Sequence, residues 1–416
     1  MSNSLEKLAA LFQENMSPAA EDVFTPVCAV VPNNGMAFFL KRTLAEKGRW
    51  GIAAGIECSF LQKFISEQIR NSLPERESEE YEGSAAAWSP AVLSWRIDAL
   101  FARDPERFSY WRDYWQHSEK DSPDAELRHI LSCELAGIFD RYHIHRLEKL
   151  AEWREGKTPA SPEQAAQAEL FRALCEEVPA PEKFYAEFLR SECAHPEKLP
   201  AKIGVFGIGT MQEFYLQCLK KLSEVSDVFL FSPSPCRNYW GDFKSKREMA
   251  KDADALDFFE EFARNNIVLS DLGSAGRKFL DRLLNNNCFS GGGGEEAYVL
   301  PCRGEKPTLL EQFQTDILNG VARKRKEGDP PADRNDRSIR VNNAPSARRE
   351  LEALHDQLAE LFYSAKKEER SCGPKTSSSC FPTSTRRRPS SNRSFPTAPS
   401  KTFSPSATGA PRGRVP

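Results

Sequence analysis

The sequence predicts an α/β protein in which a parallel sheet is interrupted by a large, all-helical insertion. Short apolar runs alternate with amphipathic helices near the N-terminus, and the same pattern resumes after residue 200. Between these regions, from about Trp88 to Arg190, the residues Leu, Ala, Glu, Arg and Trp recur at helical spacing. This order of segments is typical of an α/β layer that carries a helical insertion.

The first predicted helix begins near residue 3, where Asn3 and Glu6 are expected to form a capping box. Its apolar face comprises Leu5, Leu8, Ala9 and Phe12. Residues 27–31, Val-Cys-Ala-Val-Val, lie between Pro26 and Pro32, which predicts a short buried strand.

A helix is expected from about residue 36 to residue 47, and residues 51–56 begin another strand or a turn. This strand–helix–strand order predicts parallel pairing. After the helical insertion, the apolar residues 203–206 and 228–231 predict two more strands, with a helix at 213–222 between them.

The clearest helix of the insertion has apolar residues at spacings of three and four, namely Leu127, Ile130, Leu131, Leu135, Ile138 and Phe139. Further along the chain, residues 291–294 are four glycines and predict a loop or linker. Residues 339–342 then predict a strand, and residues 347–362 predict a strong helix that would begin a further α/β unit.

Composition is that of a globular protein with two or three domains, since the chain has 416 residues and a domain has roughly 150. Hydrophobic residues make up 40% of the chain, and no apolar run reaches the roughly 18 residues of a membrane span. The N-terminus is too polar for a signal peptide. Eleven cysteines without a CxxC pair or zinc spacing predict reduced thiols in a cytosolic protein, rather than a secreted protein or a zinc finger.

The 46 residues from Ser371 to Pro416 differ from the rest of the chain. They contain six Arg, two Lys, eleven Ser and eight Pro, but no acidic residue, Leu or Ile. Their charge of +8 leaves −11 on the other 370 residues, because the whole chain carries −3. Such a segment buries too little apolar surface to offset the entropy cost of ordering, so disorder is predicted.

Motifs for catalysis are absent from the sequence. No GxxxxGK[ST] loop is present to hold nucleotide phosphates, and no GxSxG or HExxH motif occurs. The stretch from Gly204 through Gly207 to Gly209 lacks dinucleotide-binding spacing and a strand-end acid for Mg²⁺, which favours a structural turn. His143 and His145 are two residues apart without a third ligand, so packed or solvated histidines are favoured over a metal site.

The most unusual segment follows the strand predicted at 228–231 and comprises Pro235, Cys236, Arg237, Asn238, Tyr239, Trp240, Gly241 and Asp242. Arg237, Tyr239 and Trp240 together are able to stack on bases or to contact phosphates. The favoured alternative is a structural loop that is closed by an Arg–Asp pair and plugged by the tryptophan.

Taken together, these segments resemble the RecC (gamma) subunit of bacterial exodeoxyribonuclease V, the RecBCD helicase–nuclease. The resemblance is strongest at residues 207–208, at residues 215–217 and in the segment 235–242. Further matches, in chain order through about residue 362, are Ser2-Asn3, Gly35-Met36-Ala37, residues 51–54, Phe139-Asp140, Tyr142, Arg146, Gly276-Arg277, residues 314–318, Arg349-Glu350 and residues 354–356.

The resemblance implies the fold of a superfamily 1 helicase without its ATP machinery, which agrees with the missing P-loop. Residues 1–85 and 201–330 would form the first RecA-like domain, and residues 86–200 its helical insertion. Residues 338–362 would start a second RecA-like domain. Residues 363–416 would lie outside this fold, as a disordered or out-of-frame tail.

The resemblance also implies a function. Subunits of this family scaffold two motor subunits, split the incoming duplex and scan the 3′-ended strand for the Chi signal. The implied partners are RecB-like and RecD-like subunits, double-stranded DNA ends and single-stranded DNA, with no membrane. No catalytic residue, metal or cofactor is implied in this chain, because ATP and Mg²⁺ would be used by the partner subunits.

The positions that match the family's DNA-scanning channel are Pro32, Asn34, Phe38, Phe60, Ser66, Gly137, Ile138, Asp140, Arg141 and Arg146. Pro32 and Phe38 stand where the family has amides, Ser66 replaces a tryptophan and Gly137 replaces an aspartate. Proline and phenylalanine cannot recognise a base through a bidentate amide, although Phe38 is able to stack on one. A DNA channel is therefore expected, whereas recognition of the same Chi octamer is not.

Family members are much longer than this chain, so a truncated or frameshifted gene product with a late start codon is expected. Two alternatives remain open. One is a stand-alone nucleic-acid-binding protein that uses the basic tail as an electrostatic arm. The other is an active helicase or nuclease, which the missing P-loop opposes.

Overall fold

The computed structural model describes residues 1–17, 25–46, 51–116, 124–245, 248, 266–285, 298–301, 306–323, 333 and 335–367. The chain divides into two units, Met1–Pro330 and Pro331–Pro416. The predicted glycine linker at 291–294 lies outside the described residues, as does the chain from residue 368 onward, which holds most of the predicted tail.

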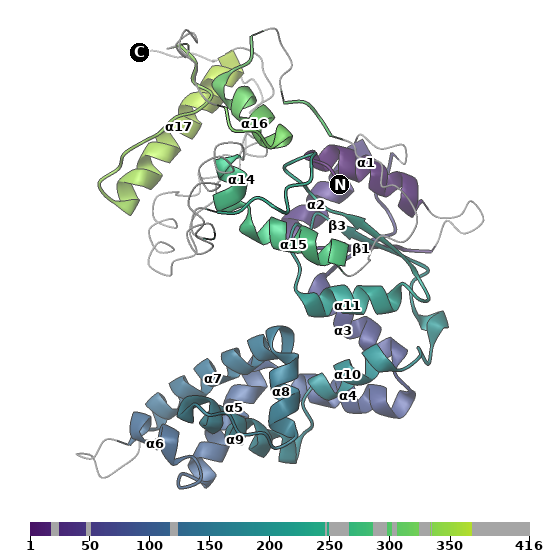
Figure 1. Ribbon diagram of the computed structural model, residues 1–416, viewed down its shortest axis with the longest axis vertical. Coiled ribbons are helices and arrows are strands. Elements are labelled where there is room, and N and C mark those ends of the chain that lie inside the picture. The colour runs from purple at the N-terminus through teal and green to yellow at the C-terminus, as the bar shows by residue number, and fades with distance from the viewer. Residues whose placement is uncertain are drawn as a thin grey trace, which may run out of the picture. The chain divides into compact units, whose positions relative to one another are not determined.

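A parallel, four-stranded sheet organises the first unit (Figure 1). In spatial order its strands are β2 (Ile56–Phe60), β1 (Val27–Val31), β3 (Lys202–Phe206) and β4 (Asp227–Phe231). Val30 pairs with Ser59 on one side and with Val205 on the other, which fixes the register of the three strands. The parallel pairing is confirmed, and three of the predicted strands have bounds that differ by no more than one residue. The strand or turn expected at 51–56 lies mostly ahead of β2, which begins at Ile56.

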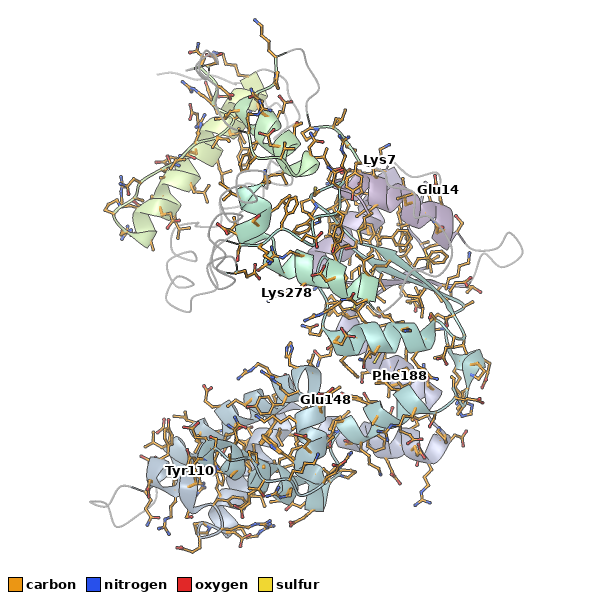
Figure 2. The ribbon with its side chains drawn as sticks, in the orientation of Figure 1. Lys7, Glu14, Tyr110, Glu148, Phe188 and Lys278 are labelled. Atoms are coloured by element: carbon orange, nitrogen blue, oxygen red, sulfur yellow. The ribbon has the colours of Figure 1, made fainter. Side chains whose placement is uncertain are left out.

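Helices cover both faces of this sheet, so alternate side chains of its strands are buried in two separate cores. The helices on the two faces are α1 (Leu5–Met16) and α2 (Asn34–Glu46) on one side, and α3 (Leu61–Ser72) and α11 (Glu213–Leu222) on the other. Helix α1 illustrates the amphipathic pattern that positions them. Leu8 and Phe12 are buried, whereas Lys7 and Glu14 are exposed (Figure 2).

The chain between β2 and β3 is helical, as predicted. After α3 it forms α4 (Glu75–Ala87), α5 (Pro90–Arg103), α6 (Ser109–Trp115), α7 (Ala125–His145), α8 (Leu147–Arg154), α9 (Pro162–Glu177), α10 (Glu182–Arg190) and a 3-10 turn (Pro196–Lys198). Its core is aromatic and includes Trp88, Phe101, Trp115, Phe139, Trp153 and Phe171. Helices α5 and α7 are joined by a bidentate ion pair in which Arg128 donates to both oxygens of Asp98, at 2.9 and 3.3 Å.

The other helices that described residues of the first unit form are α14 (Ile267–Leu272), α15 (Ser274–Asn285) and α16 (Leu309–Asn319). Helix α16 begins at a capping box between Thr308 and Glu311 and ends at Gly320, whose φ of 69° is in the left-handed region. None of the helices formed by described residues is long and apolar enough to cross a membrane.

The second unit contains α17 (Ala347–Lys367), which confirms the helix predicted there. The helix continues to Lys367, five residues beyond the end predicted for it. The strand expected at 339–342 is wrong, because no described strand pairs with it and Val341 is 93% exposed. A strand needs a neighbour to satisfy its backbone hydrogen bonds, which an apolar run by itself does not supply.

The N-terminal cap of α1 differs from the prediction. Ser4, not Asn3, caps the helix by accepting a hydrogen bond from the backbone N–H of Lys7 at 3.3 Å. The Asn3 amide instead exchanges two hydrogen bonds of 2.8 Å with the backbone of Val299. A tertiary contact from a distant part of the chain therefore takes the side chain that the local pattern assigned to the cap.

Candidate nucleic-acid interface

The carboxyl ends of the four strands lie at one edge of the sheet, where predicted channel residues gather. Asn34 and Phe38 follow β1, and Phe60 ends β2. The strand order reverses at β1, since the chain leaves β1 for β2 on one side and later returns as β3 on the other. Parallel sheets bind ligands at this position, outside the carboxyl ends of the strands beside the reversal.

The first two turns of α2 leave the side chains of Asn34 and Phe38 exposed. Asn33 caps the turn, because its side-chain oxygen accepts a hydrogen bond from the backbone N–H of Met36 at 2.9 Å. Leu40 and Leu44 hold the helix against the core. Asn34 is exposed, and Phe38 is 64% exposed, so this aromatic face is available for stacking.

Three predicted channel residues, Phe60, Ser66 and Asp140, line one cleft of about 400 Å³. They come from the end of β2, from α3 and from α7. The walls of the cleft also include the aromatic side chains of Tyr81, Trp88, Tyr185, Phe214 and Tyr215, together with the polar side chains of Gln62 and Lys63. An aromatic-walled cleft of this kind suits a planar ligand that stacks, such as a nucleobase.

The polar groups of the cleft are mostly neutral. Burial raises the pKa of the phenols of Tyr81 and Tyr185, and it raises the pKa of Tyr215 to about 12, so all three are protonated at neutral pH. The hydroxyls of Ser66 and Tyr81 share a hydrogen bond of 2.8 Å. Asp140 forms no ion pair with a described residue, and its carboxylate is able to accept hydrogen bonds from amino groups.

His143 also lines the cleft, although the sequence had suggested only a packed or solvated histidine. Burial lowers the pKa of its imidazole to about 4, so the ring is neutral at pH 7. Neither ring nitrogen has a hydrogen-bond partner in the described part of the chain. His145 is exposed, and the described residues contain no group of three His, Cys, Asp or Glu side chains that could hold a metal ion.

The structure does not bring the other predicted channel residues into this cleft. Ile138 packs against the core of the helical insertion, one residue after Gly137 in α7. Arg141 and Arg146 are exposed near the C-terminal end of α7, where the helix dipole favours positive charge. Neither arginine forms an ion pair with a described residue, so both are available to phosphate groups.

The unusual segment from Pro235 to Asp242 is organised around two buried side chains. Trp240 and Cys236 pack with Leu269 in a small apolar cluster, and Trp240 is 4% exposed. The expected Arg–Asp pair is not formed, since Arg237 and Asp242 are both exposed and no ion pair joins them. The loop is joined to the end of α16 instead, because the N–H of Arg237 donates to the carbonyl oxygen of Leu318 at 3.0 Å and the Asn238 side-chain amide donates to that of Asn319 at 2.9 Å.

Close packing explains why glycine occurs at two positions of the segment from Gly204 to Gly209. A Cβ atom on Gly204 would lie 2.5 Å from Cε2 of Phe12, which shows how closely α1 approaches β3. Gly207 has a φ of +74°, and a Cβ atom there would lie 2.9 Å from the side chain of Met36. The structure therefore agrees with a structural turn at the end of β3.

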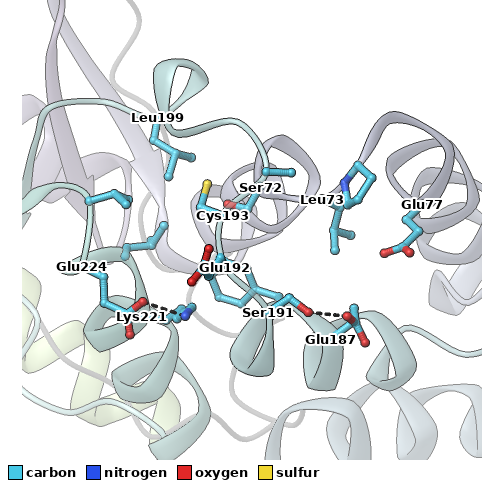
Figure 3. Close-up of a pocket in the computed structure, with 15 residues that line it drawn as sticks. Ser72, Leu73, Glu77, Glu187, Ser191, Glu192, Cys193, Leu199, Lys221 and Glu224 are labelled. Carbon is cyan, nitrogen blue, oxygen red and sulfur yellow. Dashed lines mark hydrogen bonds and ion pairs between the residues drawn. The ribbon is translucent and has the colours of Figure 1, made fainter.

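A second, smaller pocket of about 100 Å³ has an acidic lining (Figure 3). Its charged side chains are Glu77, Glu187, Glu192, Lys221 and Glu224. Lys221 pairs with Glu224 at 2.7 Å, and Ser191 donates a hydrogen bond to Glu187. The surplus of carboxylates disfavours phosphate, so we do not include this pocket in the nucleic-acid interface.

Comparison with known proteins supports the resemblance found in the sequence. The family model for the RecC N-terminal domain matches residues 1–320. The RecBCD enzyme subunit RecC of Escherichia coli K12 is 28% identical over 407 residues, covering 87% of this chain and 35% of that protein. Its counterparts in Haemophilus influenzae and Mycolicibacterium smegmatis are 27% and 25% identical, covering 87% and 85% of this chain. The chain thus spans about a third of the length of these relatives.

Proposed function

Since the chain belongs to the RecC family, we propose that it is a non-catalytic, DNA-binding subunit of an exodeoxyribonuclease V complex. Its partners would be RecB-like and RecD-like subunits, in agreement with the RecBCD subunit names of the relatives. The complex would act on double-stranded DNA ends in recombinational repair, and this chain would contact the single strand that unwinding releases.

The observation that carries the DNA-binding role is the convergence of Phe60, Ser66 and Asp140 on one aromatic cleft. Asp140 is far from Phe60 and Ser66 in sequence, and all three residues were assigned to a DNA channel by resemblance alone. Exposed Arg141 and Arg146 would supply sequence-independent attraction to phosphates. Phe38 would add a stacking face at the carboxyl edge of the sheet.

The parallel sheet and the missing P-loop support a RecA-like domain that has lost nucleotide binding. Residues 204–209 would occupy the place of the acidic strand of an ATPase, so ATP and Mg²⁺ would be bound by the partner subunits. Scanning for a Chi-type signal is part of the proposal. Because Pro32 and Phe38 offer no amide to a base, the preferred signal would differ from the family's usual octamer.

Two experiments with the full chain test this function. Co-expression with the RecB-like and RecD-like proteins of the same organism should yield a stable complex, and failure to co-purify would refute the subunit role. Binding of single-stranded DNA should weaken several-fold in Phe60→Ala, because base stacking is lost. Tyr110→Ala is the matched control, since Tyr110 is a similarly exposed aromatic on α6, outside the cleft (Figure 2). Equal losses in both variants would refute the cleft as the DNA site.

A further inference from the structure

His129 and Cys133 form a pair of metal-ligating side chains that lies outside the aromatic cleft, one turn apart on α7. The Nε2 atom of His129 and the Sγ atom of Cys133 are 3.6 Å apart. Zinc is bound at about 2.3 Å by sulfur and at about 2.0–2.1 Å by nitrogen, so two such ligands at a tetrahedral angle are about 3.5–3.6 Å apart. The two atoms therefore already have the separation that one tetrahedral zinc ion requires.

Neighbouring side chains hold the histidine in this position. Its ring stacks on the indole of Trp95, with centroids 4.2 Å apart and an angle of 32°. Its Nδ1 atom is buried without a partner among the described residues, so Nε2 is the nitrogen that remains for a ligand. Cys133 is the one described cysteine that is exposed, whereas Cys28 and Cys175 are half-buried and burial raises the pKa of each to about 12. Because zinc binds the thiolate, Cys133 is the thiol best placed to bind it.

One chain supplies only half of such a site. Structural zinc sites have four ligands, and the described residues contain no group of three His, Cys, Asp or Glu side chains that could hold a metal ion. The pair lies on an apolar part of the surface. Trp95 is 64% exposed, Val92 one turn before it on α5 is 46% exposed, and Ile130 beside His129 is 44% exposed. Large apolar side chains that are exposed together are typical of a surface that another protein covers.

We propose that His129 and Cys133 are half of a zinc site, which the same two residues of a second copy of this chain complete. A two-fold axis through the ion brings two imidazoles and two thiolates to it, a ligand set common in structural zinc sites. Each Cys133 releases its thiol proton to solvent on binding, and each His129 binds as a neutral imidazole through Nε2. Without the ion, the two atoms share a weak hydrogen bond within one chain. The inference does not depend on the proposed function.

The test measures the molar mass of the full chain by light scattering during size-exclusion chromatography, in a reductant that prevents disulfide formation. The mass should double when half an equivalent of Zn²⁺ is added, and a chelator should reverse the doubling. Titration with Co²⁺ should give the sulfur-to-cobalt charge-transfer band and the visible bands of a tetrahedral site, with one ion for two chains. Cys133→Ser should lower the zinc affinity by more than about 100-fold, because loss of an outer partner of a ligand already costs 10–100-fold. Cys133→His keeps a zinc ligand and should still dimerise with zinc.

Cys193→Ser and His145→Asn are the matched controls, since Cys193 is a half-buried cysteine beyond α10 and His145 is an exposed histidine on α7. Both variants should bind zinc and double in mass as the wild-type chain does. Zinc bound at one ion per chain without a change in mass would overturn the inference, because the site would then be complete within one chain. Absence of zinc binding by the wild-type chain, or zinc-dependent doubling of Cys133→Ser, would also overturn it.

Discussion

Gly204→Ala is expected to destabilise the protein, because β3 passes directly beneath a buried aromatic ring. A Cβ atom at this position would lie 2.5 Å from Cε2 of Phe12 and 3.2 Å from the sulfur of Met16. Carbon atoms in contact are normally about 3.5–4.0 Å apart, so the added methyl overlaps the ring by about 1 Å. Phe12 has little room to move, since it is fully buried and its ring centroid lies 5.3 Å from that of Phe231 and 5.9 Å from that of Phe206.

The expected loss is about 1–3 kcal/mol in the free energy of unfolding, which is typical of an extra methyl group forced into a packed core. Backbone strain does not contribute, because Gly204 lies within a strand and is not among the glycines with positive φ. The steric overlap with α1 is therefore the term that the substitution measures.

Gly83→Ala is a matched control with the opposite expected sign. Gly83 lies inside α4, and nothing is within 4 Å of the position that its Cβ atom would occupy. Glycine in a helix interior is less favourable than alanine by roughly 0.5–1 kcal/mol, so this variant should gain about that amount. Urea unfolding followed by circular dichroism measures both changes. An unchanged or increased stability of Gly204→Ala would refute the close packing of α1 on β3.

Three further predictions concern stability, pH and salt. Trp240→Ala should lower the free energy of unfolding by about 3–5 kcal/mol, because Trp240 fills a buried cluster. Tyr239→Ala removes a side chain that is 52% exposed and should change the free energy of unfolding by less than about 1 kcal/mol. Equal effects of the two substitutions in thermal melts would contradict this prediction. Burial raises the pKa of Glu182 to about 7, against the opposing effect of Arg154 at 3.3 Å, and one of its carboxylate oxygens is buried without a partner. Because this pKa is raised in the folded state, the Glu182 carboxyl stabilises the fold fully below about pH 4.5, and this stabilisation is lost as the pH rises through 7. In urea unfolding, the stability of Glu182→Gln should therefore not show this loss between pH 4.5 and pH 7. The affinity for single-stranded DNA should fall with salt concentration, and Arg146→Gln should reduce the slope of log affinity against log salt by about 1, because one phosphate contact is lost. An unchanged slope would exclude a phosphate contact at Arg146.

The strands show which parts of the fold were visible in the sequence. The bounds of β1 followed from an apolar run between Pro26 and Pro32, because both the hydrophobic residues and the residues that end the strand are local signals. The neighbouring strand β2 was placed too early, at 51–56, since Glu57 and Ser59 interrupt the apolar pattern of the strand that forms at Ile56–Phe60. It lies at the edge of the sheet, where polar side chains are tolerated.

The incorrect predictions share one physical cause, which is that the deciding partner lies far away in sequence. The run at 339–342 has the composition of a strand but no described strand beside it. Asn3 has the composition of a helix cap but bonds to Val299. Local composition indicates what a segment is able to form, whereas the outcome depends on which partners the tertiary fold supplies.

The aromatic cleft is the extreme case of this dependence, because the residues that line it are spread from Phe60 to Tyr215. One signal was nevertheless present in the sequence. Leu135, Phe139 and His143 recur every four residues, which places the histidine on the same buried face of α7 as the two apolar side chains. A polar ring on such a face needs a hydrogen-bond partner, and the described residues supply none. Because this ring packs against Trp88, which also lines the cleft, a histidine in an otherwise apolar helical stripe was a signal in the sequence for this wall of the cleft.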